Sequence, residues 1–433
     1  MGNHLRLIPV ESLRVGMFVA HLDRPWLETP FLFQGFYIRN EGEIEDLRRY
    51  CQSVEIDIEQ SDARLFDTAS PVASTKEKKS GRPSANGRDR SFWGWLLSLF
   101  GWKRKTLATQ PGPGEYYKDT VSTTDELVVA RTLRSGALDK LMNVMERIRS
   151  GREVSMPELE IVTGAMVDSV LRNSTAMSLL VRLEEKGEYT GMHSFESSVW
   201  ALVFGRHLGL DRDSLNAVGL GGLLMDIGKA RIPARLLNKT GELTDVEIAY
   251  LRTHVELGIE ILKESANVDR RVLEMVATHH ERFDGSGYPK GLKGNDIPVF
   301  GRIGGIVDSY SAMINDRPYA AAMSSFDAMR EFKALADKHF QAEMVEQFIQ
   351  AIGVFPVGTL VELNTGQVGV VLKENPSSRL QPEIAVILDA NKEPVEKPPV
   401  IKLEVKGDPS PTVWIANGVE PGAYDIDARK YFL

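Results

Sequence analysis

The chain has 433 residues, 42% of them hydrophobic and 26% charged, which is near the average for soluble globular proteins. This composition excludes a fibrous, collagen-like or wholly disordered chain, and the length corresponds to about three domains. The formal net charge of −8 conceals an asymmetry, because residues 76–105 carry nine basic side chains against two acidic ones and leave −15 on the rest. Folded regions this acidic argue against nucleic acid as a partner.

Residues 1–61 predict a small α+β domain. Apolar residues alternate from Val15 to Val19 and again at Val54, Ile56 and Ile58, as they do in strands, and residues 43–51 have a helical pattern. Residues 62–127 follow as a basic linker, and the near absence of apolar side chains from 76 to 90 predicts disorder there.

Residues 91–102 form an aromatic segment that contains three of the six tryptophans and has basic residues on both sides. A helix of this length cannot span a bilayer. Aromatic rings flanked by Lys and Arg are what binding at a membrane surface requires, so residues 91–105 predict peripheral contact with the inner membrane. The alternative is that this helix docks on the protein's own surface or in a dimer interface.

From residue 128 to residue 352 apolar side chains recur at spacings of three and four, which predicts an all-helical domain. Residues 353–433 change period. Two runs, 359–363 and 368–372, flank an Asn-Thr-Gly turn and predict a hairpin, with a further strand at 384–388. The predicted fold class is therefore multidomain, with a mainly all-α helical domain preceded by a small α+β domain and followed by a β-rich tail.

The sequence also carries signals of location. Cys51 is the one cysteine, so no intrachain disulfide can form, which fits a reducing compartment. The first ten residues lack an apolar core of signal-peptide length, and no stretch of about 18 apolar residues occurs. We expect a cytoplasmic protein.

Three stretches of the helical region gather polar functional groups. In the first, Asp226 ends an apolar run and Lys229 lies three residues on, on the same helix face. Such a pair is either a structural ion pair or a metal ligand beside a phosphate binder. Position alone favours the structural interpretation, because ion pairs on helices are common.

The second stretch contains His279 and His280, followed by Gly285, Gly287 and Pro289. Adjacent histidines cannot share one helix face, but both rings can turn toward one ion where a helix ends and the backbone bends. Glycine and proline supply such a bend. A site and a surface pair are about equally supported by this pattern.

The third stretch is an apolar helix interrupted by Asp308, and a buried carboxylate is costly unless it is paired or binds a metal. His193 and His254 also have apolar neighbours, and each alone would be read as a hydrogen-bonded core histidine. The argument for a metal rests on the set. Four His and two Asp in one helical domain form the mixed nitrogen and oxygen donor set that suits Fe, Mn or Zn.

The order of these residues resembles the HD-GYP family. The resemblance covers roughly residues 133–352 and is carried by His193-Ser194, Asp226-Ile227-Gly228-Lys229, His254, His279-His280-Glu281, Asp284-Gly285-Ser286-Gly287-Tyr288-Pro289, Asp308 and Arg317-Pro318-Tyr319. It implies a metal-dependent phosphodiesterase that hydrolyses bacterial cyclic dinucleotides, chiefly cyclic di-GMP. The N-terminal region is similar to an uncharacterised domain often found before this one, and the β tail to a segment that often follows it.

Carried over residue by residue, the resemblance implies two Fe or Mn ions. Asp226 would bridge them and act in catalysis with Lys229. One ion would be held by His254, His279 and His280, and the other by His193 and Asp308. Substrate would be bound by Lys229, Arg317 and Tyr288.

The chain departs from the family at several positions. Met225 stands where the family has a metal-binding His, and a thioether is a poor ligand for Fe or Mn. Tyr189 replaces the Glu of three-metal members, so we expect no third ion. Ser311 and Ala320 stand where the family usually has Asp and a basic residue, respectively. The absence of a basic side chain at position 320 should weaken phosphate binding.

Two hypotheses follow. One is an active phosphodiesterase in which water fills the place left by Met225. The other is a degenerate domain that binds cyclic dinucleotide or a partner protein without hydrolysis. The expected partners are a cyclic dinucleotide, the membrane surface, and proteins that contact the N-terminal domain or the Gly-Tyr-Pro loop; nucleic acid is not expected.

Overall fold

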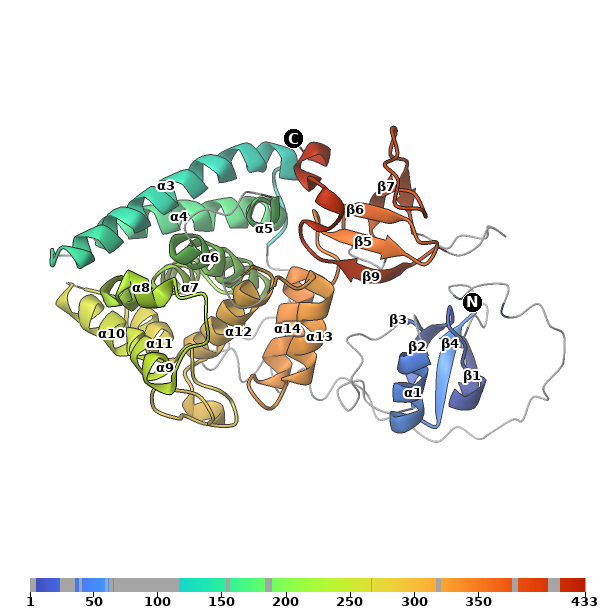
Figure 1. Cartoon of the computed structure of the whole chain (residues 1–433), viewed down its shortest axis with the longest axis horizontal. Coiled ribbons are helices and arrows are strands. Elements are labelled where there is room, and N and C mark those ends of the chain that lie inside the picture. The colour runs from blue at the N-terminus through green and yellow to red at the C-terminus, as the bar shows by residue number, and fades with distance from the viewer. Residues whose placement is uncertain are drawn as a thin grey trace, which may run out of the picture. The chain divides into compact units, whose positions relative to one another are not determined.

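The computed structural model describes residues 5–23, 36–38, 41–58, 61, 65, 117–152, 156–183, 189–265, 267–316, 321–375, 381–403 and 413–432. They form two compact units, one containing the described residues up to 65 and the other those from 117 onward (Figure 1). The aromatic segment 91–102 and the proposed membrane-contact residues 91–105 lie outside the described residues.

The first unit is an antiparallel sheet with one helix. Its strand order is β1-β4-β2-β3, and its elements are β1 (Leu5–Pro9), β2 (Phe18–Leu22), β3 (Phe36–Tyr37), α1 (Glu41–Tyr50) and β4 (Ser53–Asp57). Val54 and Ile56 on β4 and Ile44 and Leu47 on α1 are fully buried, so the inward faces of strand and helix form the core.

The strand predicted over Val15–Val19 is wrong in its first half. Gly16 adopts a φ of 96°, a conformation that favours glycine, and its N–H donates to the carbonyl of Ile38 at 2.7 Å. Residues 15 and 16 therefore form a turn, and β2 begins only at Phe18. The predicted helix and second strand are confirmed as α1 and β4.

The second unit confirms the predicted helical domain. Its helices are α3 (Thr123–Arg149), α4 (Met156–Arg172), α5 (Ser174–Leu183), α6 (Tyr189–His207), α7 (Arg212–Leu224), α8 (Ala234–Leu237), α9 (Asp245–Arg252), α10 (His254–Glu264), α11 (Arg270–Thr278), α12 (Val299–Met313), α13 (Ser325–Ala334) and α14 (Ala342–Ile352). Helix α6 is central and packs against α7 and α12. Its Trp200 is fully buried and meets Tyr310 of α12 edge-on at 5.2 Å between ring centroids.

The same unit ends in an antiparallel sheet of order β8-β7-β6-β5-β9. The strands are β5 (Leu360–Leu363), β6 (Val368–Lys373), β7 (Glu383–Leu388), β8 (Val400–Lys402) and β9 (Ile415–Val419). The predicted hairpin is confirmed as β5 and β6, and its turn contains Gly366 at a φ of 82°. The two edge strands, β8 and β9, were missed from the sequence.

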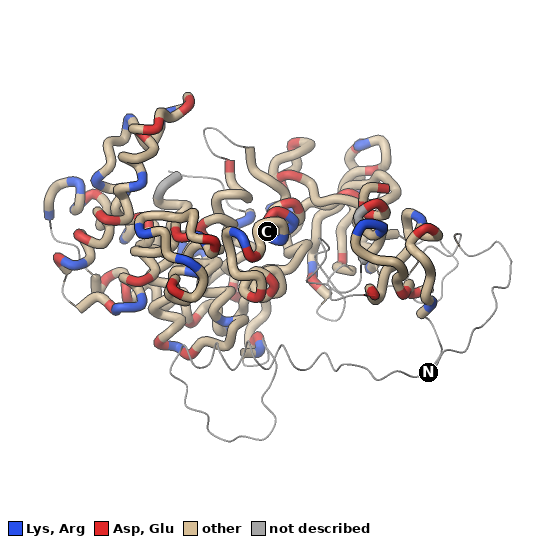
Figure 2. Tube along the Cα trace, turned by 90° about the horizontal axis from the view of Figure 1, so that it is seen from below, with Lys and Arg blue, Asp and Glu red and all other residues tan. Residues whose placement is uncertain are grey.

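Acidic and basic residues are interspersed along the described trace (Figure 2). Within this described part of the chain, no helix combines the length and the apolarity needed to cross a membrane.

Candidate metal centre

The structure brings together all six side chains that the sequence singled out as metal ligands. Donor atoms lie within 4.8 Å of one another in each of two groups, Asp226 with His254, His279 and His280, and Asp226 with His193 and Asp308. Asp226 belongs to both groups. This division coincides with the one that the HD-GYP resemblance implies.

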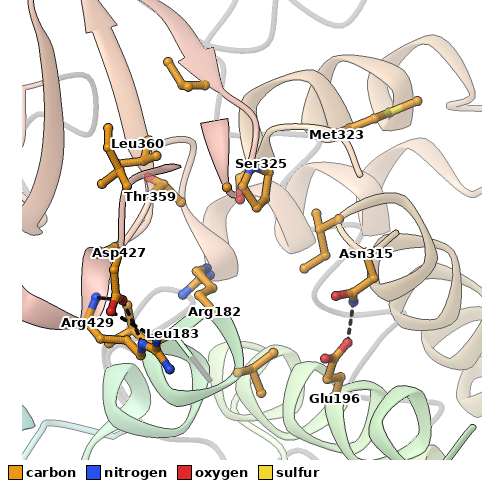
Figure 3. Close-up of a pocket in the computed structure, with 18 of the residues that line it drawn as sticks. Arg182, Leu183, Glu196, Asn315, Met323, Ser325, Thr359, Leu360, Asp427 and Arg429 are labelled. Carbon is orange, nitrogen blue, oxygen red and sulfur yellow. Dashed lines mark hydrogen bonds and ion pairs between the residues drawn. The ribbon is translucent and has the colours of Figure 1, made fainter. Parts of the chain in front are cut away.

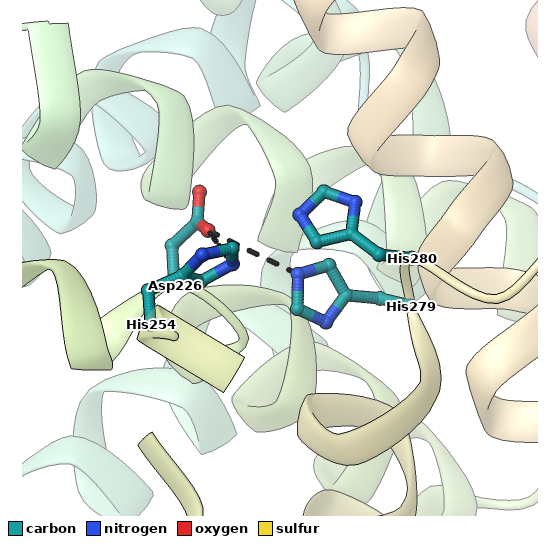
Figure 4. Close-up of side chains that lie close together, drawn as sticks. All are labelled: Asp226, His254, His279 and His280. Atoms are coloured by element: carbon teal, nitrogen blue, oxygen red, sulfur yellow. Dashed lines mark ion pairs between the residues drawn. The ribbon is translucent and has the colours of Figure 1, made fainter. Parts of the chain in front are cut away.

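Asp226 is positioned by a close approach of two elements. It follows Met225 at the end of α7 and directly precedes the short 3-10 helix η4 (Ile227–Arg231). A Cβ added at Gly228 would lie 1.9 Å from the carbonyl oxygen of His254 and 2.6 Å from the amide nitrogen of Gly258. Only glycine allows η4 to pack this closely on α10, and that contact sets Asp226 opposite His254 (Figure 4).

His254 and His279 each present one ring nitrogen to Asp226. The Nδ1 atoms of His254 and His279 lie 2.7 Å from the carbonyl of Leu251 and 2.9 Å from that of Val276. Because a carbonyl can only accept, each Nδ1 carries the hydrogen and each Nε2 keeps its lone pair. These Nε2 atoms are 3.4 Å and 3.9 Å from Asp226 Oδ1. Burial lowers the pKa of both rings, that of His254 to about 4, so both are neutral near pH 7.

The arrangement fits a divalent cation. Asp226 Oδ1, His254 Nε2 and His279 Nε2 are all buried without a hydrogen-bond partner in the part of the chain that the structure describes. Leaving a buried polar atom unsatisfied costs about 1–3 kcal/mol. One carboxylate oxygen and two nitrogen lone pairs that face one another form a donor set for Fe, Mn or Zn.

The second oxygen of Asp226 faces the other group. Asp226 Oδ2 lies 2.7 Å from Lys229 Nζ and 3.6 Å from His193 Nε2. His193 Nε2 is also 2.9 Å from Asp308 Oδ1. Burial alone would raise the pKa of Asp226, but Lys229 and the surrounding imidazoles hold it below its ordinary value. The ion pair predicted for Asp226 and Lys229 is therefore formed, and it lies within the cluster.

The helix end and bend predicted around His279 and His280 are confirmed. Helix α11 ends at Thr278, and both histidines follow it. Farther along, a Cβ at Gly287 would lie 2.3 Å from the amide nitrogen of Arg282, so the loop can fold back only with glycine there. The turn places the Tyr288 ring on His280, with ring centroids 4.6 Å apart.

The carboxylate of Glu281 fastens this loop. It is 4% exposed, and its two oxygens accept hydrogen bonds from the backbone N–H groups of Lys290 at 2.8 Å and Leu292 at 2.9 Å. The guanidinium of Arg252 lies over the Tyr288 ring in a cation–π contact, with Cζ 4.7 Å from the ring centroid. The loop therefore forms a stack that leads from the exposed Arg252 to His280.

Some of the predicted positions lie outside what the structure describes. Arg317 and Ala320 lie outside the described residues, as does the side chain of Tyr189. Met225 is fully buried next to Asp226.

Sequence reasoning missed Glu196 and Asn315, and noted Ser311 only as a departure from the family. All three take part in a buried hydrogen-bond network next to His193. The available signal was spacing: Glu196 lies one helical turn after His193, and Ser311 one turn after Asp308.

A cavity of about 430 Å³ lies between the helices and the sheet of the second unit. It is lined by both apolar and polar side chains, and none of the six predicted ligands faces it. Glu196 and Asn315 meet at its wall (Figure 3). The cavity and the cluster of predicted ligands are thus neighbours that share one hydrogen-bond network.

Three sequence families match the chain. An HD domain matches residues 172–344, a domain of unknown function (DUF3391) matches residues 5–159, and a KOW domain associated with HD domains matches residues 360–420.

Characterised relatives are similar over part or most of the chain. A cyclic di-GMP phosphodiesterase of Pseudomonas aeruginosa is 32% identical over 387 residues, which are 89% of this chain and 86% of the relative. One of Thermotoga maritima is 38% identical over 144 residues, 33% of this chain and 39% of that protein. A 3′3′-cGAMP-specific phosphodiesterase of Vibrio cholerae is 34% identical over 169 residues, 39% of this chain and 32% of that protein.

Proposed function

Because the chain belongs to the HD-GYP family, we propose that it is a metal-dependent cyclic di-GMP phosphodiesterase that hydrolyses a 3′,5′-phosphodiester in bacterial second-messenger signalling. The observation that carries the proposal is the convergence of three buried atoms, Asp226 Oδ1, His254 Nε2 and His279 Nε2, that have no hydrogen-bond partner among the described residues. Nothing in a purely structural core would require them to face one another.

We propose that the site holds two ions, Fe or Mn, and no third. His254, His279 and His280 would bind one ion, His193 and Asp308 the other, and Asp226 both. When bound, such a pair of cations stabilises the attacking and leaving oxygens and lowers the pKa of a bound water. Nitrogen and oxygen donors without cysteine suit these metals.

The residues around the cluster would bind the substrate. The side chain of Lys229 is 24% exposed while its ammonium pairs with Asp226, so Lys229 is proposed to bind a phosphate of the substrate. Tyr288, whose ring is stacked on the proposed ligand His280, is proposed as another substrate contact. Arg317 is proposed as a second phosphate ligand on the sequence alone.

The test is hydrolysis by purified protein loaded with Mn(II) or Fe(II), with linear dinucleotide measured by chromatography. Turnover of cyclic di-GMP is expected, and Asp226→Ala should abolish it. Asp213→Ala is the matched control, because Asp213 is an exposed carboxylate on α7 at the far end from Asp226.

Met225 favours a second candidate, a domain that binds cyclic dinucleotide or a partner protein without hydrolysis. It occupies a fully buried position directly before Asp226. If the unmodified protein leaves cyclic di-GMP intact while Met225→His turns it over, the second candidate replaces the first.

We also propose, from the sequence alone, that residues 91–105 bind an anionic membrane surface. Flotation with anionic liposomes, comparing the chain with and without these residues, tests this. Equal flotation of the two proteins would dispose of the idea.

A further inference from the structure

We propose that Glu196 is a positioning residue for the metal ligand His193, acting through the hydroxyl of Ser311. The inference rests on the proposed metal centre, but it concerns metal binding and can be tested without hydrolysis. Its basis is a chain of buried contacts between α6 and α12, from Asp308 through His193 and Ser311 to Glu196.

The chain of contacts has four members. Helix α6 contributes His193 and Glu196, one turn apart, and α12 contributes Asp308 and Ser311, also one turn apart. His193 Nδ1 lies 3.1 Å from Ser311 Oγ, which donates to Glu196 Oε2 at 2.9 Å. On the other side of the imidazole, Nε2 lies 2.9 Å from Asp308 Oδ1. Ser311 is fully buried, and Glu196 and His193 are only 3% and 5% exposed.

A fifth residue holds the carboxylate in place. Asn315, one turn beyond Ser311, donates from Nδ2 both to Glu196 Oε2 at 2.5 Å and to the backbone carbonyl of Ser311 at 2.8 Å. The Glu196 oxygen thus accepts from an amide and a hydroxyl, which is the role of an ionised carboxylate. Figure 3 shows this pair at the cavity wall.

The direction of the hydrogen bonds selects the tautomer of His193. Ser311 has one hydroxyl hydrogen, and a carboxylate that can only accept takes it. The oxygen of Ser311 must then accept from His193 Nδ1–H, so Nε2 is the one ring nitrogen left to bind an ion. At 2.9 Å from Asp308 Oδ1, Nε2 donates a hydrogen to that carboxylate, and an ion that binds there would displace this hydrogen. That nitrogen is the one that faces Asp308 and Asp226. Without the carboxylate, Ser311 is free to donate to Nδ1, and the one ring hydrogen would stay on Nε2, where it opposes metal binding.

His193 needs a side chain to fix its tautomer because of its position within α6. His254 and His279 sit at helix ends, where the carbonyl three residues earlier accepts from Nδ1. His193 lies within α6, where the preceding carbonyls already accept the helical N–H groups. Its Nδ1 must therefore find a side chain, and Ser311 alone cannot specify a tautomer because a hydroxyl both donates and accepts.

The test compares Mn(II) binding by the full chain and its variants, with free Mn(II) followed by electron paramagnetic resonance. His193→Ala identifies the ion that His193 serves. Glu196→Leu removes the hydrogen-bond acceptor at similar side-chain volume. It should lower the affinity for the Mn(II) ion that depends on His193 about 10- to 100-fold, and leave the affinity for the ion bound by His254 and His279 unchanged. Ser198→Ala is the matched control, since Ser198 is a buried serine of α6 that donates to the carbonyl of Gly219 instead.

A rescue separates positioning from packing. Adding Ser311→Asp to Glu196→Leu puts a carboxylate within direct reach of Nδ1 and should restore the affinity, which a purely structural loss would not allow. Parent-like binding by Glu196→Leu, no rescue by Ser311→Asp, or no ion in the parent that depends on His193 would overturn the proposal. If Glu196→Leu does not fold, Ser311→Ala decides by the same measurement. Hydrolysis enters none of these outcomes, so a failure of the proposed activity is seen separately.

Discussion

The close contact between η4 and α10 makes Gly228→Ala a sharp test of how the site is built. The added Cβ would lie 1.9 Å from the carbonyl oxygen of His254, whereas ordinary contacts begin near 3.4 Å, so one backbone must move by about 1.5 Å. Both obstacles, His254 O and Gly258 N, are backbone atoms that no rotamer change can move away. We expect a cost of about 3 kcal/mol, the upper end for overpacking.

The assay is thermal unfolding together with Mn(II) binding. A loss of about 3 kcal/mol corresponds to a Tm lower by roughly 6–12 °C for a domain of this size. Mn(II) binding should weaken as well, because the shift separates His254 from Asp226. Gly241→Ala is the control, since a Cβ there meets nothing within 4 Å. If Gly228→Ala melts within about 2 °C of that control and binds Mn(II) equally well, the close packing does not set the site.

Three further outcomes are expected. Glu281→Ala should make the chain near Lys290 more sensitive to trypsin, because two charge-assisted hydrogen bonds of about 1.5–3 kcal/mol each are lost, whereas Glu281→Gln should lose less. Burial would raise the pKa of Glu126, but hydrogen bonds from Arg172 and Ser169 lower it below its ordinary value. This carboxylate therefore stabilises the fold above its unfolded-state pKa, and the contribution is lost as the pH falls through its folded-state pKa; Glu126→Gln should flatten the acid limb of a Tm profile. A chelator should lower the Tm of the metal-loaded parent and leave that of Asp226→Ala unchanged, since only an ion bound to the native state stabilises it.

The ligands could be found from the sequence because each breaks a pattern. Asp226 and Asp308 interrupt apolar helices, where an unpaired carboxylate is costly, and the His279–His280 pair is followed by glycines that no regular helix needs. Such local contradictions between propensity and composition mark functional positions. The spacing alone could not say whether Asp226 and Lys229 form an ion pair or a site, and the structure shows the ion pair inside the cluster.

The hydrogen-bond network around His193 could not be found in this way. Glu196 and Ser311 are far apart in the sequence and meet only because α6 and α12 pack side by side. The edge strands were missed for a different reason. Strand β8 is three residues long, and Gly418 interrupts the alternation of β9 where a Cβ would press on Ser324. Both the hydrogen-bond network and the edge strands depend on interactions that tertiary packing creates, so no local sequence pattern predicts them.

The two halves of the cluster are held by different means, and this bears on how the chain tolerates change. His254 and His279 are oriented by backbone carbonyls, which no substitution removes. His193 is oriented by side chains, so its half of the site depends on the residues at 196 and 311. By the family resemblance, the departures Met225 and Ser311 would both fall on that half, while the other half keeps the complete set of donors that the resemblance implies. If activity is impaired, the weak point is therefore the ion served by His193 and Asp308, and Met225→His should gain most when the link through Ser311 to Glu196 is intact.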